Sequence, residues 1–405
     1  MLDLKERELE LRQDIKSLEV WLNNNNYIGY DPYDLRGQAW FSSFFHRNGA
    51  IFRKIRGLLY YLEVLAPLFF RKLFRVKAER NAKAIGLILQ GYVNMYRAFG
   101  DEADIEKAKT LFLTLLRDQS VGYEGLSWGY PFHWQSRVII PRGTPSVVVT
   151  GTVAQALFDL YECTKDPSVR NAIEGIREFF LKELNRSYRE GGLCFSYTPI
   201  DNFKVLNASL FAGSFFARYY NLTGCEESKS LAASTAVYAA AEQRCDGLFY
   251  YWSEEPKSMI DHYHMGFTIR FLQDISRFCG DKIAERAAIA GFVAFKKELL
   301  DSDGRTLFSP GERYPIDLHA FSETLLTNTC FDISYCQSKE VGVVLNDIKK
   351  YKRKDGAYDA GVKKVFGFRV PQRIPYIRWV NAWLFCSMSA VLLNLVLIDR
   401  GRDSA

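Results

Sequence analysis

Apolar residues recur along most of the chain at the spacing of packed helices. The segment 148–163 is followed by 167–184, and 261–278 is followed by 282–300; each pair is separated by a short polar turn such as Asp166-Pro167. Apolar positions three and four residues apart predict amphipathic helices, and the turn between two such segments predicts a helical hairpin.

Five loops repeat along the chain, each with an acidic residue directly before a glycine and aromatic or apolar residues after it. Intervals of 52 to 66 residues separate them, enough for two helices each. Together with hairpins in the first 120 residues they give about six hairpins. We therefore predict an all-α fold, an (α/α)6 toroid with short Gly-aromatic loops or strands at one rim; the alternative is an open solenoid. The glycines are Gly125, Gly191, Gly247, Gly304 and Gly356.

No linker rich in Pro, Gly or Ser divides the chain. We predict a single domain over residues 1–405, to which residues 1–50 could add a helical extension at the N-terminus. The first 22 residues are charged and carry an apolar stripe at helical spacing. The polar run 23–26 ends that helix.

Residues 57–70 are strongly apolar and lie between the basic segments 53–56 and 71–75. Spanning a bilayer takes about 20 apolar residues, so this stretch is too short to cross one. We expect a buried helix of the domain with a solvated basic end. The alternative is peripheral membrane contact through residues 53–75, as an amphipathic anchor. The apolar run 383–398 is predicted to be the last packed helix.

Composition adds three constraints. The net charge of +6 is mild and no nucleic-acid or nucleotide motif is present, so we expect neither a nucleic-acid partner nor a cofactor. The eight Cys form no CxxC pair, and the chain starts without a basic and apolar leader pattern. We therefore expect a cytoplasmic protein. The alternative is a protein bound peripherally to the inner membrane. Aromatic residues reach 15%, and several flank the Gly loops.

A first cluster of candidate residues lies in the segment 128–145. Trp and Tyr rings stack on the C–H surfaces of sugars, and Arg pairs with a carboxylate or phosphate through parallel hydrogen bonds. We expect this segment to bind substrate; the alternative is a structural loop whose Arg side chains pair with nearby acids. The candidates are Trp128, Trp134, Gln135, Arg137 and Arg142 for binding and His133 for proton transfer.

A second cluster, Asp261-His262-Tyr263-His264, begins a predicted helix. Imidazole titrates near neutral pH, so His262, His264 and the more distant His319 are candidate general acids or bases. Tyr263 is a secondary candidate for proton transfer, and Asp261 is assigned to the substrate-binding group or to a helix N-cap. A metal site would need His319 as a third ligand, and we expect none.

A third cluster opens the last helix, where Trp379 and Trp383 share a face beside Arg378. An Arg and Trp face could hold an anionic sugar or could be packing. Tyr197 in the second Gly loop is a further binding candidate. Weaker candidates are Asn202, Asn207, Tyr30, Asp31 and Asp34.

The stretch WGYPFHWQ…PRGTPSVVVTGTVAQALFDLYE, followed by DHYHMGFTIRFL, resembles proteins of bacterial capsule, exopolysaccharide and lipopolysaccharide assembly. Those proteins are similar in outline to six-hairpin carbohydrate enzymes, among them N-acylglucosamine 2-epimerases, unsaturated glucuronyl hydrolases and glucuronyl C5-epimerases. The resemblance covers roughly residues 120–400 and implies the toroid fold and a carbohydrate substrate. It assigns no catalytic residue.

Two functions follow as hypotheses. The first is an enzyme of surface-polysaccharide biosynthesis that acts on an acidic sugar or polysaccharide intermediate by epimerisation, elimination or hydrolysis. The second is a non-catalytic glycan-binding or scaffold protein of a membrane-associated assembly complex. A terpenoid cyclase would share only the helical architecture, because the chain lacks aspartate-rich DDxxD and DxDD motifs.

Overall fold

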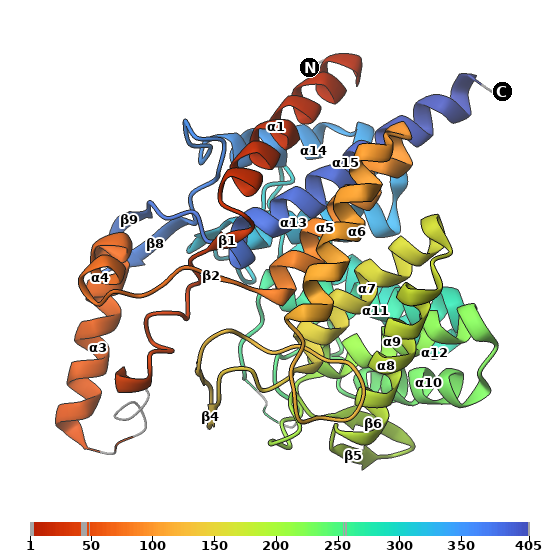
Figure 1. The fold of residues 1–405 in the computed structure, drawn as a ribbon, viewed down its shortest axis with the longest axis horizontal. Helices are drawn as coiled ribbons and strands as arrows, with labels where there is room; N and C mark the ends of the chain where they lie inside the picture. The colour runs from red at the N-terminus through yellow and green to blue at the C-terminus, as the bar shows by residue number, and fades with distance from the viewer. Residues whose placement is uncertain (1–3, 42–46, 48, 254, 256, 404–405) are drawn as a thin grey trace.

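A computed structural model describes residues 4–41, 47, 49–253, 255 and 257–403. In this part of the chain, six helices form an inner ring in which each helix packs against the next and the last packs against the first (Figure 1). The predicted toroid is confirmed, and closure of the ring excludes the open solenoid. The inner helices are α5 (Ala82–Phe99), α7 (Val147–Thr164), α9 (Leu206–Thr223), α11 (His262–Cys279), α13 (Leu318–Phe331) and α15 (Ala382–Asp403).

An outer layer of helices covers the ring. The N-terminal helix α1 (Leu4–Asn24) packs against α15, so the two ends of the chain supply one hairpin. Its buried face includes Leu11, Ile15, Leu18 and Leu22, the stripe expected from the sequence. The other outer helices are α6 (Glu102–Arg117), α8 (Pro167–Lys182), α10 (Glu226–Ala241), α12 (Lys282–Glu298) and α14 (Lys339–Lys349).

Polar caps determine where the inner helices begin. Asn81, Ser146, Asp261 and Asp317 each accept a hydrogen bond from a backbone N–H in the first turn of the helix that follows. An outer helix returns the chain between each inner helix and the next, so the inner helices are parallel and their N-termini meet at one rim of the ring. This rim therefore collects unpaired backbone N–H groups and the positive ends of the helix dipoles.

Short antiparallel strands and loops connect the helices of the ring, as the Gly-aromatic repeats predict. β1 pairs with β2, β3 with β4 and β5 with β6, and β8 pairs with β7 on one side and β9 on the other. The bounds are β1 (Ile28–Gly29), β2 (Glu79–Arg80), β3 (Trp134–Gln135), β4 (Ile139–Ile140), β5 (Arg186–Arg189), β6 (Gly192–Phe195), β7 (Ile316–Asp317), β8 (Gly361–Val365) and β9 (Phe368–Gln372). A 3-10 turn η1 (Ile333–Gln337) precedes α14, and a π-helical turn η2 (Ile377–Asn381) leads into α15.

The ring closes where α5 meets α15. A Cβ atom added to Gly91 of α5 would lie 2.4 Å from the Phe385 ring of α15, so only glycine permits this approach.

The segment Ile377–Arg400 is the one described helix long and apolar enough to cross a membrane, but 72% of its most apolar window is buried in the protein. The prediction that residues 383–398 form a packed helix is confirmed.

Helices α3 (Ala50–Leu65) and α4 (Pro67–Leu73) project from the side of the ring (Figure 1). Of the side chains of α3, only Glu63 and Val64 are buried. The expectation that residues 57–70 form a buried helix is therefore wrong for α3. The apolar side chains of this helix are largely exposed, although its sequence has the period of a packed helix.

Candidate functional site

A cavity of about 270 Å³ lies at the rim where the inner helices begin. Residues near the N-termini of five inner helices line it: Lys83 of α5, Val148 of α7, Asn207 of α9, His264 of α11 and His319 of α13. Aromatic side chains from the loops, from β3, from α11 and from η2 form much of the remaining wall, namely Tyr33, Tyr130, Trp134, Tyr197, Tyr251, Trp252, Tyr263 and Trp379. Aromatic walls with a few convergent polar groups are typical of small-molecule and sugar sites.

His264 is held in one orientation by Asp261. The Nδ1 atom of His264 lies 2.6 Å from Oδ2 of Asp261, and Oδ1 of the same carboxylate accepts the backbone N–H of His264. Because a carboxylate only accepts, the proton of the neutral ring is on Nδ1, and the lone pair of Nε2 accepts no hydrogen bond from the residues that the structure describes. His264 is partly exposed while Asp261 is buried behind it. This arrangement is that of an oriented general base.

His319 lies between two aromatic rings in the wall of the cavity. Its ring stacks on Tyr263 at 4.6 Å and on Trp383 at 4.8 Å between centroids. Burial and the neighbouring cations Lys83 and Arg378 hold the pKa of His319 well below its usual value, so the ring is neutral. Among the described residues neither of its buried nitrogen atoms has a hydrogen-bond partner, so the ring adds unsatisfied polar atoms to the cavity wall.

Two buried cations face the same space. Arg378 forms a bidentate pair with Asp31, at 2.5 and 2.8 Å, and its guanidinium lies 5.0 Å from the centre of the Tyr130 ring. Burial opposes the charged form, but Asp31 raises the pKa of Arg378 above its usual value. Burial and the charge of Arg378 lower the pKa of Lys83, whose amine lies 5.3 Å from the centre of the Trp383 ring. The cavity therefore presents an amine and a guanidinium to a ligand, and an anionic ligand beside Lys83 would favour the protonated form of the amine.

The cavity lining contains no Asp or Glu among the described residues. Asp261 lies behind His264, and Asp317 accepts hydrogen bonds from Nε1 of Trp379 at 2.9 and 3.1 Å. Burial raises the pKa of Asp317 to about 6. Burial also raises the pKa values of Tyr197, Tyr251 and Tyr263, so these phenols stay protonated as hydrogen-bond donors near neutral pH.

The structure brings together many of the residues expected from the sequence. Tyr33, from the N-terminal segment, also reaches the cavity, and Asp31 beside it holds Arg378. The candidates that line the cavity are Trp134, Gln135, Tyr197, Tyr263, His264, His319, Arg378 and Trp379, with the weaker candidate Asn207.

His262 lies elsewhere. It is fully buried, with Nδ1 bonded to the carbonyl of Leu307 and Nε2 to the hydroxyl of Thr324, at 2.9 and 2.8 Å. Burial lowers the pKa of His262 to about 4. Both ring nitrogens are used within the protein, so His262 has a structural role and not the acid or base role predicted.

Two aromatic and imidazole candidates of the first cluster also have structural roles. Trp128 is fully buried and donates from Nε1 to the carbonyl of Leu115, which corrects its assignment to substrate binding. His133 accepts the backbone N–H of Arg142 through Nδ1 and lies outside the cavity lining.

The two arginines of the first cluster pair with acids, as the structural alternative anticipates. Arg142 forms a bidentate pair with Glu79 away from the cavity. Arg137 pairs with Glu255 and lies 3.7 Å from the centre of the Trp252 ring, so it touches the cavity wall from outside.

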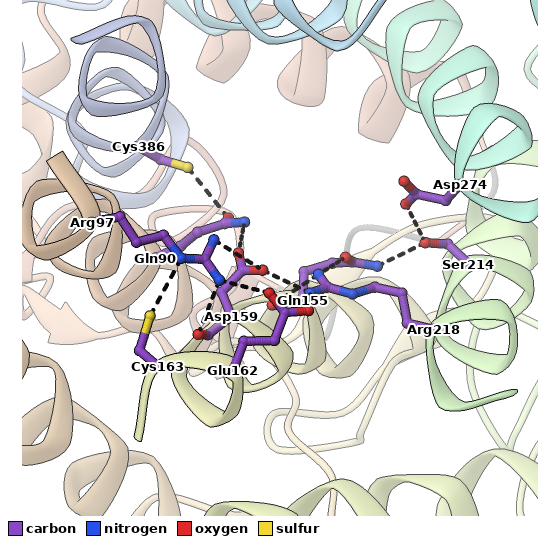
Figure 2. Close-up of polar contacts among 10 residues, drawn as sticks. All are labelled: Gln90, Arg97, Gln155, Asp159, Glu162, Cys163, Ser214, Arg218, Asp274 and Cys386. Carbon is purple, nitrogen blue, oxygen red and sulfur yellow. Dashed lines mark hydrogen bonds and ion pairs between the residues drawn. The ribbon is translucent and has the colours of Figure 1, made fainter. Parts of the chain in front are cut away.

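A second cavity, of about 330 Å³, lies further along the ring axis toward the C-terminal ends of the inner helices. Trp383 lines this cavity and separates it from His319, so Trp383 does not reach the first cavity as expected. Figure 2 shows the polar network around it, in which Arg97 of α5 and Arg218 of α9 approach the acids of α7 from two sides.

The arginines of this network form ion pairs with its acidic residues. Arg218 lies 2.7 Å from Asp159, and Arg97 lies 2.7 Å from Glu162. Gln155 joins the same network by accepting from Arg218 and donating to Ser214, whose hydroxyl donates to Asp274 (Figure 2). We interpret this network as a connection between neighbouring inner helices, and the first cavity as the candidate site.

The sequence patterns missed several residues of the cavity. Lys83 follows the N-cap Asn81 at the start of an apolar helix, and a lone Lys within such a helix is the signal that could have found it. Tyr251 and Trp252 lie in the third Gly loop, where the aromatic repeat indicated them as a group but not individually.

No family model matches the chain, and no curated protein matches its sequence. Solved structures share the fold at low identity. Cellobiose 2-epimerase from Bacillus thermoamylovorans matches with a TM-score of 0.61 at 13% identity, over 81% of this chain and 90% of that one. A GH76 α-mannanase from Bacteroides thetaiotaomicron matches at 0.59 and 14%, over 81% and 89%. A family 88 glycosyl hydrolase from Bacteroides vulgatus matches at 0.54 and 11%, over 82% and 98%.

Proposed function

We propose that this toroid is a carbohydrate-active enzyme that removes a proton from a sugar carbon next to a carbonyl or carboxylate group, as an epimerase or a lyase. The observation that carries the proposal is the pairing of His264 with Asp261 beside two buried cations. Structural neighbours named as a sugar epimerase, a polysaccharide lyase and glycoside hydrolases support a carbohydrate substrate for this fold.

His264 is the proposed base. Its Nε2 accepts the proton, while Asp261 stabilises the imidazolium that results. An acidic sugar fits the cations: Arg378 and Lys83 would bind its carboxylate and offset the negative charge that develops when the proton leaves. Because burial raises the pKa values of Tyr251 and Tyr263, both hydroxyls stay protonated and can donate hydrogen bonds to the oxygen atoms of a bound sugar.

Hydrolysis fits the cavity less well. Glycoside hydrolysis ordinarily uses two carboxyl groups on opposite sides of the scissile bond. The described lining of the cavity supplies none, because Asp261 and Asp317 are both engaged behind other side chains. Among the three reactions considered, this observation favours epimerisation or elimination.

For the biological setting, we propose surface-polysaccharide biosynthesis in the cytoplasm. Support for the pathway comes from the sequence resemblance of residues 120–400. Support for the substrate class comes from the aromatic and cationic cavity, which suits an acidic sugar unit.

The test is incubation of the purified chain in D2O with a panel of uronic-acid oligosaccharides and neutral reducing disaccharides. Proton NMR would detect exchange or inversion at one ring carbon, and ultraviolet absorbance would detect an unsaturated uronate. We expect turnover of an acidic substrate that His264→Asn abolishes. His133→Asn, a His from outside the cavity, is the matched control and retains turnover.

Failure to turn over any sugar in the panel would contradict the proposal. If the panel then showed saturable binding that Trp379→Ala weakens, the site would instead belong to a non-catalytic glycan-binding protein. Release of reducing sugar without exchange at a ring carbon would assign the site to a hydrolase.

A further inference from the structure

The projecting helix α3 presents its apolar face to the outside. Ile51, Ile55, Leu58 and Leu65 recur at spacings of four, three and seven residues and are all exposed, Ile51 by 72%. Such spacing places them on one side of the helix. In a packed helix this face would be buried, so α3 is amphipathic and its apolar side is left uncovered by the residues that the structure describes.

The exposed face extends beyond α3. Phe69 of α4 is 60% exposed, and Phe366 and Phe368 at the β8–β9 turn are 78% and 76% exposed. Phe366 lies 4.8 Å from Tyr61 of α3 between ring centroids, so the turn is continuous with the helix. We call the exposed apolar residues of α3, α4 and the β8–β9 turn the apolar face. A contiguous exposed face of this kind marks an interaction surface.

The charges around the apolar face are basic. Residues 47–77 contain eight Lys or Arg and one acid, Glu63, which is buried. Arg53 and Lys54 are exposed beside the apolar stripe of α3, and Lys72 and Arg75 are exposed at the end of α4. The β8–β9 hairpin adds Lys364 and Arg369. The ligand of this surface must therefore combine an apolar interior with negative charge.

The projection is held firmly in place. Arg71 of α4 is fully buried, and its guanidinium bonds Asp34 at 2.8 Å and Glu63 of α3 at 3.1 Å. Gln372 of β9 donates to the carbonyl of Val64 at 2.8 Å. A segment that exposed its apolar side chains for lack of structure would not have these buried contacts. The apolar face is therefore built into the fold.

We propose that the apolar face is a docking surface for an anionic lipid bilayer, with α3 lying in the membrane interface. An amphipathic helix with a basic flank binds such a surface through apolar burial and attraction to anionic headgroups. A second copy of this chain fits less well, because pairing two apolar faces would bring Arg53 and Lys54 of one copy toward the basic residues of the other. The surface is separate from the cavity, so the proposal does not depend on catalytic activity.

The docking surface adjoins the candidate site. The Arg36 guanidinium pairs with Glu63 of α3 at 3.2 Å and lies 5.9 Å from the Tyr60 ring centre. The same guanidinium lies 5.5 Å from the ring centre of Tyr33, which lines the cavity. A single side chain thus separates the proposed membrane surface from the cavity wall.

The test is flotation of the full chain with vesicles of phosphatidylcholine alone and of phosphatidylcholine with phosphatidylglycerol. We expect binding to the anionic vesicles that high salt weakens, and little binding to the neutral ones. Leu58→Asp with Leu65→Asp places charge in the apolar face and should reduce binding about tenfold or more. Arg53→Gln with Lys54→Gln should remove the preference for anionic vesicles.

Ile289→Asp with Val293→Asp is the matched control, because these residues are similarly exposed on the outer helix α12. This control should float like the wild type, and circular dichroism checks that both double variants are folded. Wild-type protein that fails to float, or that floats equally well with the α3 substitutions, overturns the proposal. So does light scattering that finds a dimer, if the α3 substitutions separate it and the wild type does not bind vesicles.

Discussion

Asp261 contacts His264 twice, through Oδ2 to the ring Nδ1 and through Oδ1 to the backbone N–H. One carboxylate thus caps α11 and orients the proposed base. Asp261→Asn keeps a good capping side chain but removes the charge behind the ring. We expect kcat to fall at least about tenfold while the free energy of unfolding changes by less than about 1 kcal/mol.

Steady-state kinetics and urea unfolding of the same sample check this prediction. The control is Asp281→Asn, which changes the cap of the outer helix α12 and should leave kcat unchanged. An Asp261→Asn variant with wild-type kcat would show that the carboxylate acts only as a cap.

Lys83 is a buried amine without a bonded acid in the part of the chain that the structure describes, and burial lowers its pKa. Lys83→Met keeps the length of the side chain and removes the polar group. We expect the variant to be more stable by roughly 1–3 kcal/mol and to lose activity on acidic sugars. A depressed Lys pKa costs stability as pH falls below 10.5, so the gain should be larger at pH 7 than at pH 10.

Urea unfolding at the two pH values measures the gain. Activity on an acidic and on a neutral sugar separates loss of charge recognition from general damage. A destabilised Lys83→Met variant would mean that the amine makes a stabilising contact.

The helical hairpins were predictable because the sequence patterns that indicate them are local: apolar residues at helical spacing, and Gly loops between the helices. The closure of the hairpins into a ring was not predictable, because it depends on contact between α5 and α15, which are about 290 residues apart in sequence. The exposure of α3 was not predictable either. An apolar helical face has the same sequence pattern whether it packs on protein or on something else.

Within the site, the sequence located the cluster of His262 and His264 at the start of a helix, but it could not show which of the two side chains lines the cavity. His262 and His264 are two residues apart, which turns them about 200° around a helix. One ring therefore enters the cavity and the other enters the core. Arg378 was identified beside Trp379 and Trp383, but Lys83 was not, because it reaches the cavity only through the arrangement of helices distant in sequence.

His262 should make the fold sensitive to acid. Its pKa is lowered from 6.5 to about 4, so its contribution is complete above pH 6.5 and is lost as pH falls toward 4, by about 3 kcal/mol. His262→Gln can still donate to Leu307 and accept from Thr324 without titrating. Urea unfolding at pH 7 and pH 4.5 should show a smaller decrease for this variant than for the wild type. His133→Gln should follow the wild type.

Asp159 and Glu162 distinguish a buried from an exposed member of the α7 network. Asp159 is buried between Arg218 and Gln90, whereas the Glu162 side chain is 50% exposed. We expect Asp159→Asn to destabilise the fold by about 3 kcal/mol and Glu162→Gln by less than about 1 kcal/mol. Urea unfolding measures both. Unchanged kcat in both variants would agree with a structural role for the second cavity; loss of kcat in folded Glu162→Gln would contradict it.

Gly91 tests the closure of the ring. Gly91→Ala forces a methyl group against Phe385, so we expect a loss of about 1–3 kcal/mol. Gly57→Ala is the matched control: no atom lies within 4 Å of its added methyl, and alanine in this exposed helix should gain about 0.5–1 kcal/mol. Thermal unfolding of both variants measures the difference. Equal effects would mean that α5 and α15 are not in close contact.

The hairpin formed by α1 and α15 has a consequence for how the chain folds. During synthesis α1 is made before the ring helices, but α15, which covers its apolar stripe, is the last of the inner helices to be made. Arg7 of α1 also bonds the carbonyls of Cys336 and Ser338, more than 320 residues away in sequence. Joining such distant segments costs loop entropy before it gains contacts, so ring closure should be the slow, late step of folding. Until then, the first helix exposes apolar surface that a chaperone could bind.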